Sequence, residues 1–176
     1  MYILNLIITC PRHFEDEANE EISRILMEFG DQEPKVTITN MPGILTARTS
    51  LDPINTIEKI RDKILDEPWS IRYCFRIIPI QNSCQTNVRE IVDKIQNMIG
   101  VLKPHESYRI TIEKRNSKIL SDELISEIAK NIPNKVCLDN PDWVILIEII
   151  GDETGVSILR NNTILSVEKV KRSLSE

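Results

Sequence analysis

The sequence predicts an α+β protein in which an N-terminal ferredoxin-like (βαββαβ) domain is followed by an α/β domain. Three observations predict this architecture. Residues 1–80 alternate β-branched runs with amphipathic helical periodicity in the order β-α-β-β-α-β. The rest of the chain begins with a helical pattern and later contains WVILIEII, which is apolar enough for a strand covered on both faces. Pro79 and the stretch QNSC mark the join, so we place the domains at 1–80 and 81–176.

The first domain combines four expected strands with two expected helices. Its strands are residues 2–9, 35–39, 43–49 and 70–80. An apolar stripe predicts a helix over 13–30 that ends at Gly30, a residue type that commonly terminates helices. A second helix, over 51–65, begins with Asp52 as N-cap and Pro53 at the first helical position.

The second domain has a different order of elements. We expect helices over residues 86–100, 121–132 and 163–174 and strands over 107–114, 142–150 and 155–162. Ser121 is the expected N-cap of the middle helix. The strand at 142–150 is expected to lie in the centre of its sheet.

The composition argues against several classes of protein. Hydrophobic residues make up 41% of the chain, and no run approaches the roughly 20 apolar residues of a membrane span. The N-terminus lacks a basic leader and a small-residue cleavage pattern, so we expect no signal peptide. Four widely separated cysteines fit neither a zinc site nor a disulfide framework and indicate reduced thiols in a cytoplasmic protein.

Motifs for catalysis are missing from the sequence. His13 and His105 have no evident partner, and no glycine-rich nucleotide loop, nucleophile elbow or HExxH motif occurs. We therefore expect a protein that is not an enzyme and that uses no cofactor and no metal.

The net charge of −5 is unevenly distributed. Residues 1–71 carry −6, residues 72–135 carry +4 and residues 136–176 carry −3. The basic block could bind a polyanion locally, because salt limits the reach of each charge to about 10 Å. Charge counting alone favours a solvated surface, since Lys and Arg occur on every protein surface.

Four stretches of the sequence carry a family resemblance: FRIIPIQNSC (75–84), YRITIEKRNSKILSDELISEIAKNI (108–132), KVCLDNPDWVILIEI (135–149) and GVSILRN (155–161). Together they resemble a THUMP domain, the RNA-binding module of several tRNA-modifying enzymes, which a ferredoxin-like domain usually precedes. More narrowly, CFRIIPIQNSC, IEKRN and LDNPDWVILIEI resemble the stand-alone THUMP proteins that assist tRNA cytidine acetylation.

This resemblance implies a non-catalytic adaptor. It would present tRNA to a separate RNA acetyltransferase that makes N4-acetylcytidine. The chain ends at Glu176, which we interpret as leaving no room for a catalytic domain. Two alternatives stay open: a THUMP module that serves another modification enzyme (a methyltransferase or thiolation enzyme), and an enzyme or small-ligand regulator built on the ferredoxin-like half.

The resemblance also indicates which side chains would contact tRNA: Arg76, Arg109, Lys114, Arg115, Asn116, Lys118 and Lys135. We expect Lys114 and Arg115 to hold phosphates where their strand ends, with a hydrogen bond from Asn116 to phosphate or ribose. Arg109 could instead pair with Glu148 or with another carboxylate on the same sheet. Arg76 could equally form an ion pair between the domains. The NPD sequence at 140–142 is most simply a turn.

Overall fold

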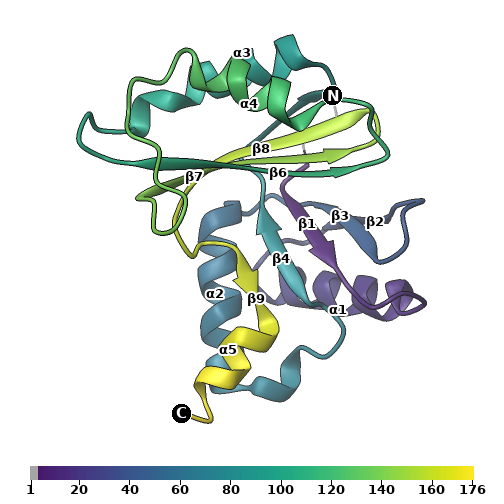
Figure 1. Ribbon diagram of the computed structural model, residues 1–176. Coiled ribbons are helices and arrows are strands. Elements are labelled where there is room, and N and C mark those ends of the chain that lie inside the picture. Colours follow the sequence, from purple (N-terminus) through teal and green to yellow (C-terminus); the bar gives the residue numbers. More distant parts are fainter. Residues whose placement is uncertain (1–3) are drawn as a thin grey trace. The chain divides into compact units, whose positions relative to one another are not determined.

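The computed structural model describes residues 4–176 (Figure 1). It contains two compact units, and the mixed α+β class predicted from the sequence is confirmed. The first unit consists of residues up to Ile80 together with Asn162–Glu176, and the second of Gln81–Asn161. The structure differs from the predicted division at the C-terminus, because residues 162–176 join the first unit rather than the second.

The first unit is built on a five-stranded sheet with the order β2-β3-β1-β4-β9. Its strands are β1 (Leu6–Thr9), β2 (Lys35–Ile38), β3 (Ile44–Arg48), β4 (Arg76–Pro79) and β9 (Leu165–Ser166). Neighbouring strands are antiparallel. Along the chain the elements follow the order β1, helix, β2, β3, helix, β4, so the predicted βαββαβ order is confirmed. Residues 2 and 3 of the predicted first strand lie outside the described residues.

The helices of this unit are α1 (Glu15–Glu28), α2 (Pro53–Asp66) and α5 (Val167–Ser173). The predicted start of α2 is confirmed, because the Asp52 side chain accepts a hydrogen bond from the backbone N–H of Asn55 at 2.9 Å. Gly30 follows α1 with a φ of +110°, a conformation that favours glycine at a helix end.

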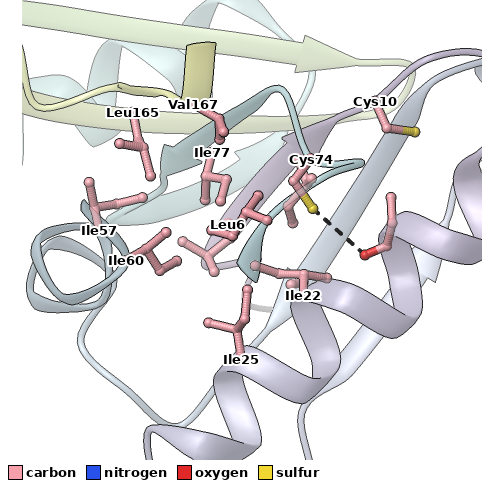
Figure 2. Close-up of a cluster of buried hydrophobic side chains, with 14 of the residues drawn as sticks. Leu6, Cys10, Ile22, Ile25, Ile57, Ile60, Cys74, Ile77, Leu165 and Val167 are labelled. Carbon is pink, nitrogen blue, oxygen red and sulfur yellow. Dashed lines mark hydrogen bonds between the residues drawn. The ribbon is translucent and has the colours of Figure 1, made fainter. Parts of the chain in front are cut away.

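The core of the first unit forms between the sheet and its helices. Figure 2 shows apolar side chains from both long helices meeting those of β1 and β4, with residues of the C-terminal segment beside them. Its fully buried members include Leu6, Ile22, Ile25, Ile57, Ile60, Ile77 and Leu165. The apolar stripes predicted for α1 and α2 therefore do face a core.

The C-terminal segment completes this unit. The prediction of one helix over 163–174 was wrong in part, because Leu165 and Ser166 form β9 beside β4 before α5 begins. The backbone N–H of Val167 donates to the Phe75 carbonyl at 2.9 Å, and Lys171 Nζ donates to the Ile71 carbonyl at 2.5 Å. A two-residue strand is too short for its own periodicity to reveal it.

The second unit is built on a four-stranded sheet with the order β5-β8-β7-β6. Its strands are β5 (Asn82–Gln85), β6 (Tyr108–Arg115), β7 (Trp143–Ile150) and β8 (Glu153–Arg160). β6 and β7 are parallel, and the other pairs are antiparallel. β7 is buried from Val144 to Ile149, which confirms the expected central strand. The QNSC stretch, predicted as a join, is instead mostly the edge strand β5.

Two helices, α3 (Val88–Met98) and α4 (Ser121–Ala129), cover one face of this sheet (Figure 1). Its core is largely isoleucine, contributed by Ile91, Ile95, Ile128, Ile145, Ile147 and Ile149. Ser121 was predicted as the N-cap of α4, but Leu120 occupies that position and makes no side-chain capping bond. Short 3₁₀ turns, η1 (Pro68–Ser70) and η2 (Ile99–Val101), complete the described elements. Among residues 4–176, no helix combines the length and the apolar character needed to cross a bilayer.

Candidate nucleic-acid interface

β6 contains three of the seven predicted site residues, Arg109, Lys114 and Arg115, and the loop after it contains Asn116 and Lys118. It is an edge strand that pairs along its length with β7. The other edge of β6 has a backbone partner only at its first residue, within the described residues. There Tyr108 forms backbone hydrogen bonds with Lys135 and Cys137. Alternate side chains of β6 point toward the helices or away from them, as its period of two predicted.

Lys114 is the next-to-last residue of β6, and Lys118 lies in the loop that follows the strand. Lys114 Nζ donates to the Ile119 carbonyl at 2.8 Å, which holds the ammonium in place on an exposed surface. An ammonium has three donors, so two stay available for a phosphate. Asn116 turns the chain with a φ of +54°, a conformation that asparagine tolerates. Lys118 is exposed, and its side chain has no ion-pair or hydrogen-bond partner within residues 4–176.

Arg115, in contrast, is held by an internal ion pair. Its Nη1 atom lies 2.9 Å from Oε2 of Glu148, whose side chain is fully buried, while the Arg115 side chain is 23% exposed. We expected Glu148 to be an alternative partner of Arg109. The register explains the difference, because Glu148 lies beside Glu113, and Arg115 is the next residue on that face. Contact between Arg115 and RNA phosphate stays a prediction.

Arg109 and Lys135 lie near the N-terminal end of β6. Arg109 Nη1 donates to the Leu138 carbonyl at 2.8 Å, which ties β6 to the segment that follows α4. Lys135 has an exposed side chain, and its carbonyl accepts the N–H of Tyr108 at 3.0 Å. The cations of β6 are therefore separated along the strand. The Cα atoms of Arg109 and Lys114 are about 17 Å apart along the strand, at the usual rise of about 3.3 Å per residue.

A polar cluster that the sequence did not reveal fixes this end of the unit. The Glu106 carboxylate accepts the backbone N–H of Lys103 at 2.9 Å and pairs with Arg160 at 2.5 Å. The Lys103 N–H and Arg160, followed by Trp143, lower the pKa of Glu106 to about 2. The Arg160 guanidinium lies over the Trp143 ring, 3.9 Å from its centroid. No motif indicates this cluster, because Glu106, Trp143 and Arg160 are far apart in the chain.

The NPD stretch is a turn with structural contacts. Asp142 accepts hydrogen bonds from the backbone N–H of Ser107 at 2.8 Å and from its hydroxyl at 3.1 Å. Pro141 is buried, and the Asn140 side chain accepts from Asn161 at 3.2 Å. These contacts join the segment before β7 to that before β6 and agree with the expected turn.

Arg76 belongs to the other unit. It lies in β4, where its backbone pairs with Thr9 on one side and Ser166 on the other. Both the contact of Arg76 with RNA and its alternative, an ion pair between the domains, stay predictions. The other six candidates all lie in the second unit.

The second unit is not basic as a whole. Residues 81–161 contain 10 Lys and Arg against 12 Asp and Glu, a net charge of −2. The positive block of residues 72–135 includes Arg72 and Arg76, which fold into the first unit. The acidic Asp122 and Glu123 occupy the first turn of α4 and offset the positive end of that helix. An RNA interface here would depend on a few local cations.

Two of the cysteines, Cys10 and Cys84, are poor nucleophiles because their thiols are held in the protonated form. Burial, followed by the carboxylates of Glu15 and Glu17, raises the pKa of Cys10 to about 11. Burial and the Glu90 carboxylate likewise raise the pKa of Cys84 to about 11. Within residues 4–176 no cluster of three His, Cys, Asp or Glu side chains is placed to hold a metal ion.

Known proteins resemble this chain in sequence. Residues 85–159 match the THUMP domain family. The chain is 29% identical over 155 residues to the THUMP domain-containing protein 1 homolog of Drosophila melanogaster, covering 82% of this chain and 46% of that protein. It is 27% identical over 128 residues to the uncharacterized protein MJ0421 of Methanocaldococcus jannaschii, covering 70% of this chain and 34% of that protein.

A solved structure shares the fold. The crystal structure of PH1313 from Pyrococcus horikoshii superposes with a TM-score of 0.64 at 15% identity, over 89% of this chain and 55% of that one. The chain spans less than half the length of either sequence relative. The family match extends from the end of β5 to the end of β8 and so includes α3, α4 and the cations of β6. Residues 85–159 of this chain are therefore a THUMP domain.

Proposed function

We propose that the protein is a non-catalytic tRNA-binding adaptor that presents tRNA to a separate RNA cytidine acetyltransferase for N4-acetylcytidine formation. The observation that carries the proposal is the THUMP domain at residues 85–159, because domains of this type bind RNA in tRNA-modifying enzymes. The acetylation step is supported by the resemblance of CFRIIPIQNSC, IEKRN and LDNPDWVILIEI to the stand-alone acetylation adaptors.

The contacts with RNA would come from both ends of β6. Lys114 and Lys118 at one end and Lys135 at the other have exposed side chains on which phosphates can be bound. Arg109 and Asn116 would add hydrogen bonds from the same strand and its turn. Cations at separated points of one strand suit recognition of an RNA backbone by shape, since the deep groove of A-form RNA excludes side chains.

Few phosphate contacts imply weak binding that depends strongly on salt. About three or four contacts correspond to a slope of about −3 in a plot of log affinity against log salt concentration. An adaptor can function with such affinity, because a bound catalytic partner supplies the rest through linked sites. The proposal places the protein in the cytoplasm, and its four unpaired cysteines agree with a reducing compartment.

The proposal is tested by deleting the gene and measuring modified nucleosides in purified tRNA by mass spectrometry. We expect N4-acetylcytidine to disappear and to return with the wild-type protein. A Lys114→Ala/Lys118→Ala variant should restore less of it than a Lys35→Ala/Lys169→Ala control, which removes two exposed lysines of the first unit.

Unchanged N4-acetylcytidine after deletion would contradict the acetylation step. If the amount of a methylated or thiolated nucleoside in tRNA fell instead, the THUMP domain would serve another modification enzyme. Recovery of that enzyme with the tagged protein would identify it.

A further inference from the structure

The first unit exposes an aromatic surface that its core does not use. Trp69 is 68% exposed, Phe75 is 49% exposed and Phe14 is 43% exposed. The Phe14 ring stacks on Tyr73 with 5.6 Å between centroids. Tyr73 therefore connects two of the exposed rings, since it stacks on Phe14 and lines a groove with Trp69. Tryptophan is well buried on average in proteins, and clustered exposed aromatic rings indicate a contact surface.

Two of these rings line a groove. Trp69 and Tyr73 bound a hollow of about 560 Å³, and α1 contributes Glu17, Glu20 and Arg24 to its wall. This volume falls within the range of about 300–1,000 Å³ that is found for ligand pockets. Every lining residue belongs to the first unit.

The aromatic segment is held rigidly by a buried carboxylate. Glu21, only 6% exposed, accepts the backbone N–H groups of Arg72 at 2.5 Å, Tyr73 at 3.0 Å and Cys74 at 2.9 Å. Figure 2 shows Cys74 in the core, where its Sγ lies 3.7 Å from the Ala18 carbonyl. The residues on either side of Cys74 are consequently turned outward. Rigid aromatic side chains are effective anchors because little entropy is lost when they bind.

The turn that carries Trp69 is fixed as well. Trp69 lies in η1, and the Arg24 guanidinium donates to the Ser70 carbonyl at 3.2 Å. The Ser70 N–H donates to the Glu67 carbonyl at 2.9 Å. Trp69 is therefore an exposed ring on a fixed turn.

The charges around the groove favour a protein partner over RNA. Glu17 and Glu20 form no ion pair within residues 4–176, and they lie one turn apart on α1. Asp16 adds a further exposed carboxylate to the first turn of that helix. Arg24 and Arg72 also line the groove, and the Arg24 guanidinium is engaged with the Ser70 carbonyl. The carboxylates of α1 outnumber the remaining cation, so this wall repels phosphates and attracts Lys or Arg side chains. Trp69 beside them adds a ring face on which a cation can stack.

We propose that this groove is a docking site for a basic and apolar segment of a partner protein. A large apolar side chain of the segment fills the space between Trp69 and Tyr73. Lysine or arginine side chains on either side of it pair with Glu17 and Glu20. The inference does not depend on the proposed acetyltransferase, because it rests on the first unit alone.

The test uses a phage library of random 12-residue peptides, selected on the full-length protein. We expect enriched peptides to carry Lys or Arg within a few residues of Leu, Met, Phe or Trp. Binding of the synthesised peptides, measured by fluorescence anisotropy, should weaken at least about tenfold in Trp69→Ala. It should weaken similarly in Glu17→Gln/Glu20→Gln, while a Glu58→Gln/Asp62→Asn control on the exposed face of α2 should bind normally.

The same variants separate this inference from RNA binding. Trp69→Ala should keep wild-type affinity for tRNA and a wild-type circular dichroism spectrum, since its side chain is largely exposed. Loss of tRNA affinity in Trp69→Ala would show that the groove binds RNA and would overturn the inference. Enrichment of acidic peptides would overturn it as well. So would peptides that bind Trp69→Ala as tightly as they bind wild type.

Discussion

Replacement of Arg115 by alanine should destabilise the second unit. The side chain is only 23% exposed and pairs at 2.9 Å with the fully buried Glu148 carboxylate. Removing one partner of a buried pair costs about 3–5 kcal/mol. Partial exposure of Arg115 places the expected loss at the lower end, about 3 kcal/mol. At a urea m-value of about 1–2 kcal/mol/M for a unit of this size, the midpoint should fall by about 1.5–3 M.

The assay exploits the two tryptophans of the chain. In a Trp69→Phe background, the remaining Trp143 lies at the start of β7 and reports unfolding of the second unit. In a Glu148→Gln background, Arg115→Ala should lower the free energy of unfolding by much less, because no buried charge is then left unpaired. Lys118→Ala, an exposed neighbour, should change the midpoint little. A shift in Arg115→Ala no larger than in Lys118→Ala would refute the reasoning.

Three further predictions concern other parts of the chain. Gly43→Ala should destabilise the first unit by about 2–3 kcal/mol, seen as a lower thermal midpoint, because Gly43 has a φ of +75° and an added Cβ would lie 2.6 Å from the Cys10 carbonyl oxygen; an unchanged midpoint would contradict this. The pKa of Glu106 is lowered from 4.5 to about 2, so its stabilising effect is present above pH 4.5 and is lost as the pH falls toward 2. The Trp143 urea midpoint should therefore fall more on acidification in wild type than in Glu106→Gln, and equal losses would count against the Arg160 pair. Cys10 and Cys84, whose pKa values are raised to about 11, should be alkylated slowly at pH 8 until guanidinium unfolds the chain; rapid labelling of either in the native protein would argue against its burial.

Long periodic elements could be predicted from the sequence, and short polar ones could not. The Asp52–Pro53 start of α2 and the apolar run of β7 each contain their own signal. β5 is NSCQ and β9 is LS, and both are strands because a neighbouring strand pairs with them. Such pairing depends on residues far away in the chain, as does the return of residues 162–176 to the first unit.

The candidate site shows the same limit. The sequence identified Lys114 and Lys118 at the end of a strand, and the structure places them there with exposed side chains. It did not reveal that Arg115 pairs with Glu148, because this contact follows from the register of β6 on β7. Nor could a charge count along the chain show that the second unit has a net charge of −2, since the positive block includes residues of both units.

The central claim is that Lys114, in β6, and Lys118, in the loop after it, hold RNA phosphates. It is tested most directly by tRNA binding across a salt series. Fluorescence anisotropy between about 50 and 200 mM salt would compare wild type, Lys114→Ala/Lys118→Ala and the Lys35→Ala/Lys169→Ala control. We predict salt-dependent binding by wild type and the control, and for Lys114→Ala/Lys118→Ala a weaker affinity with a log–log slope shallower by about 1–2. Equal affinities and slopes for all three proteins, or no salt-sensitive binding by wild type, would contradict it.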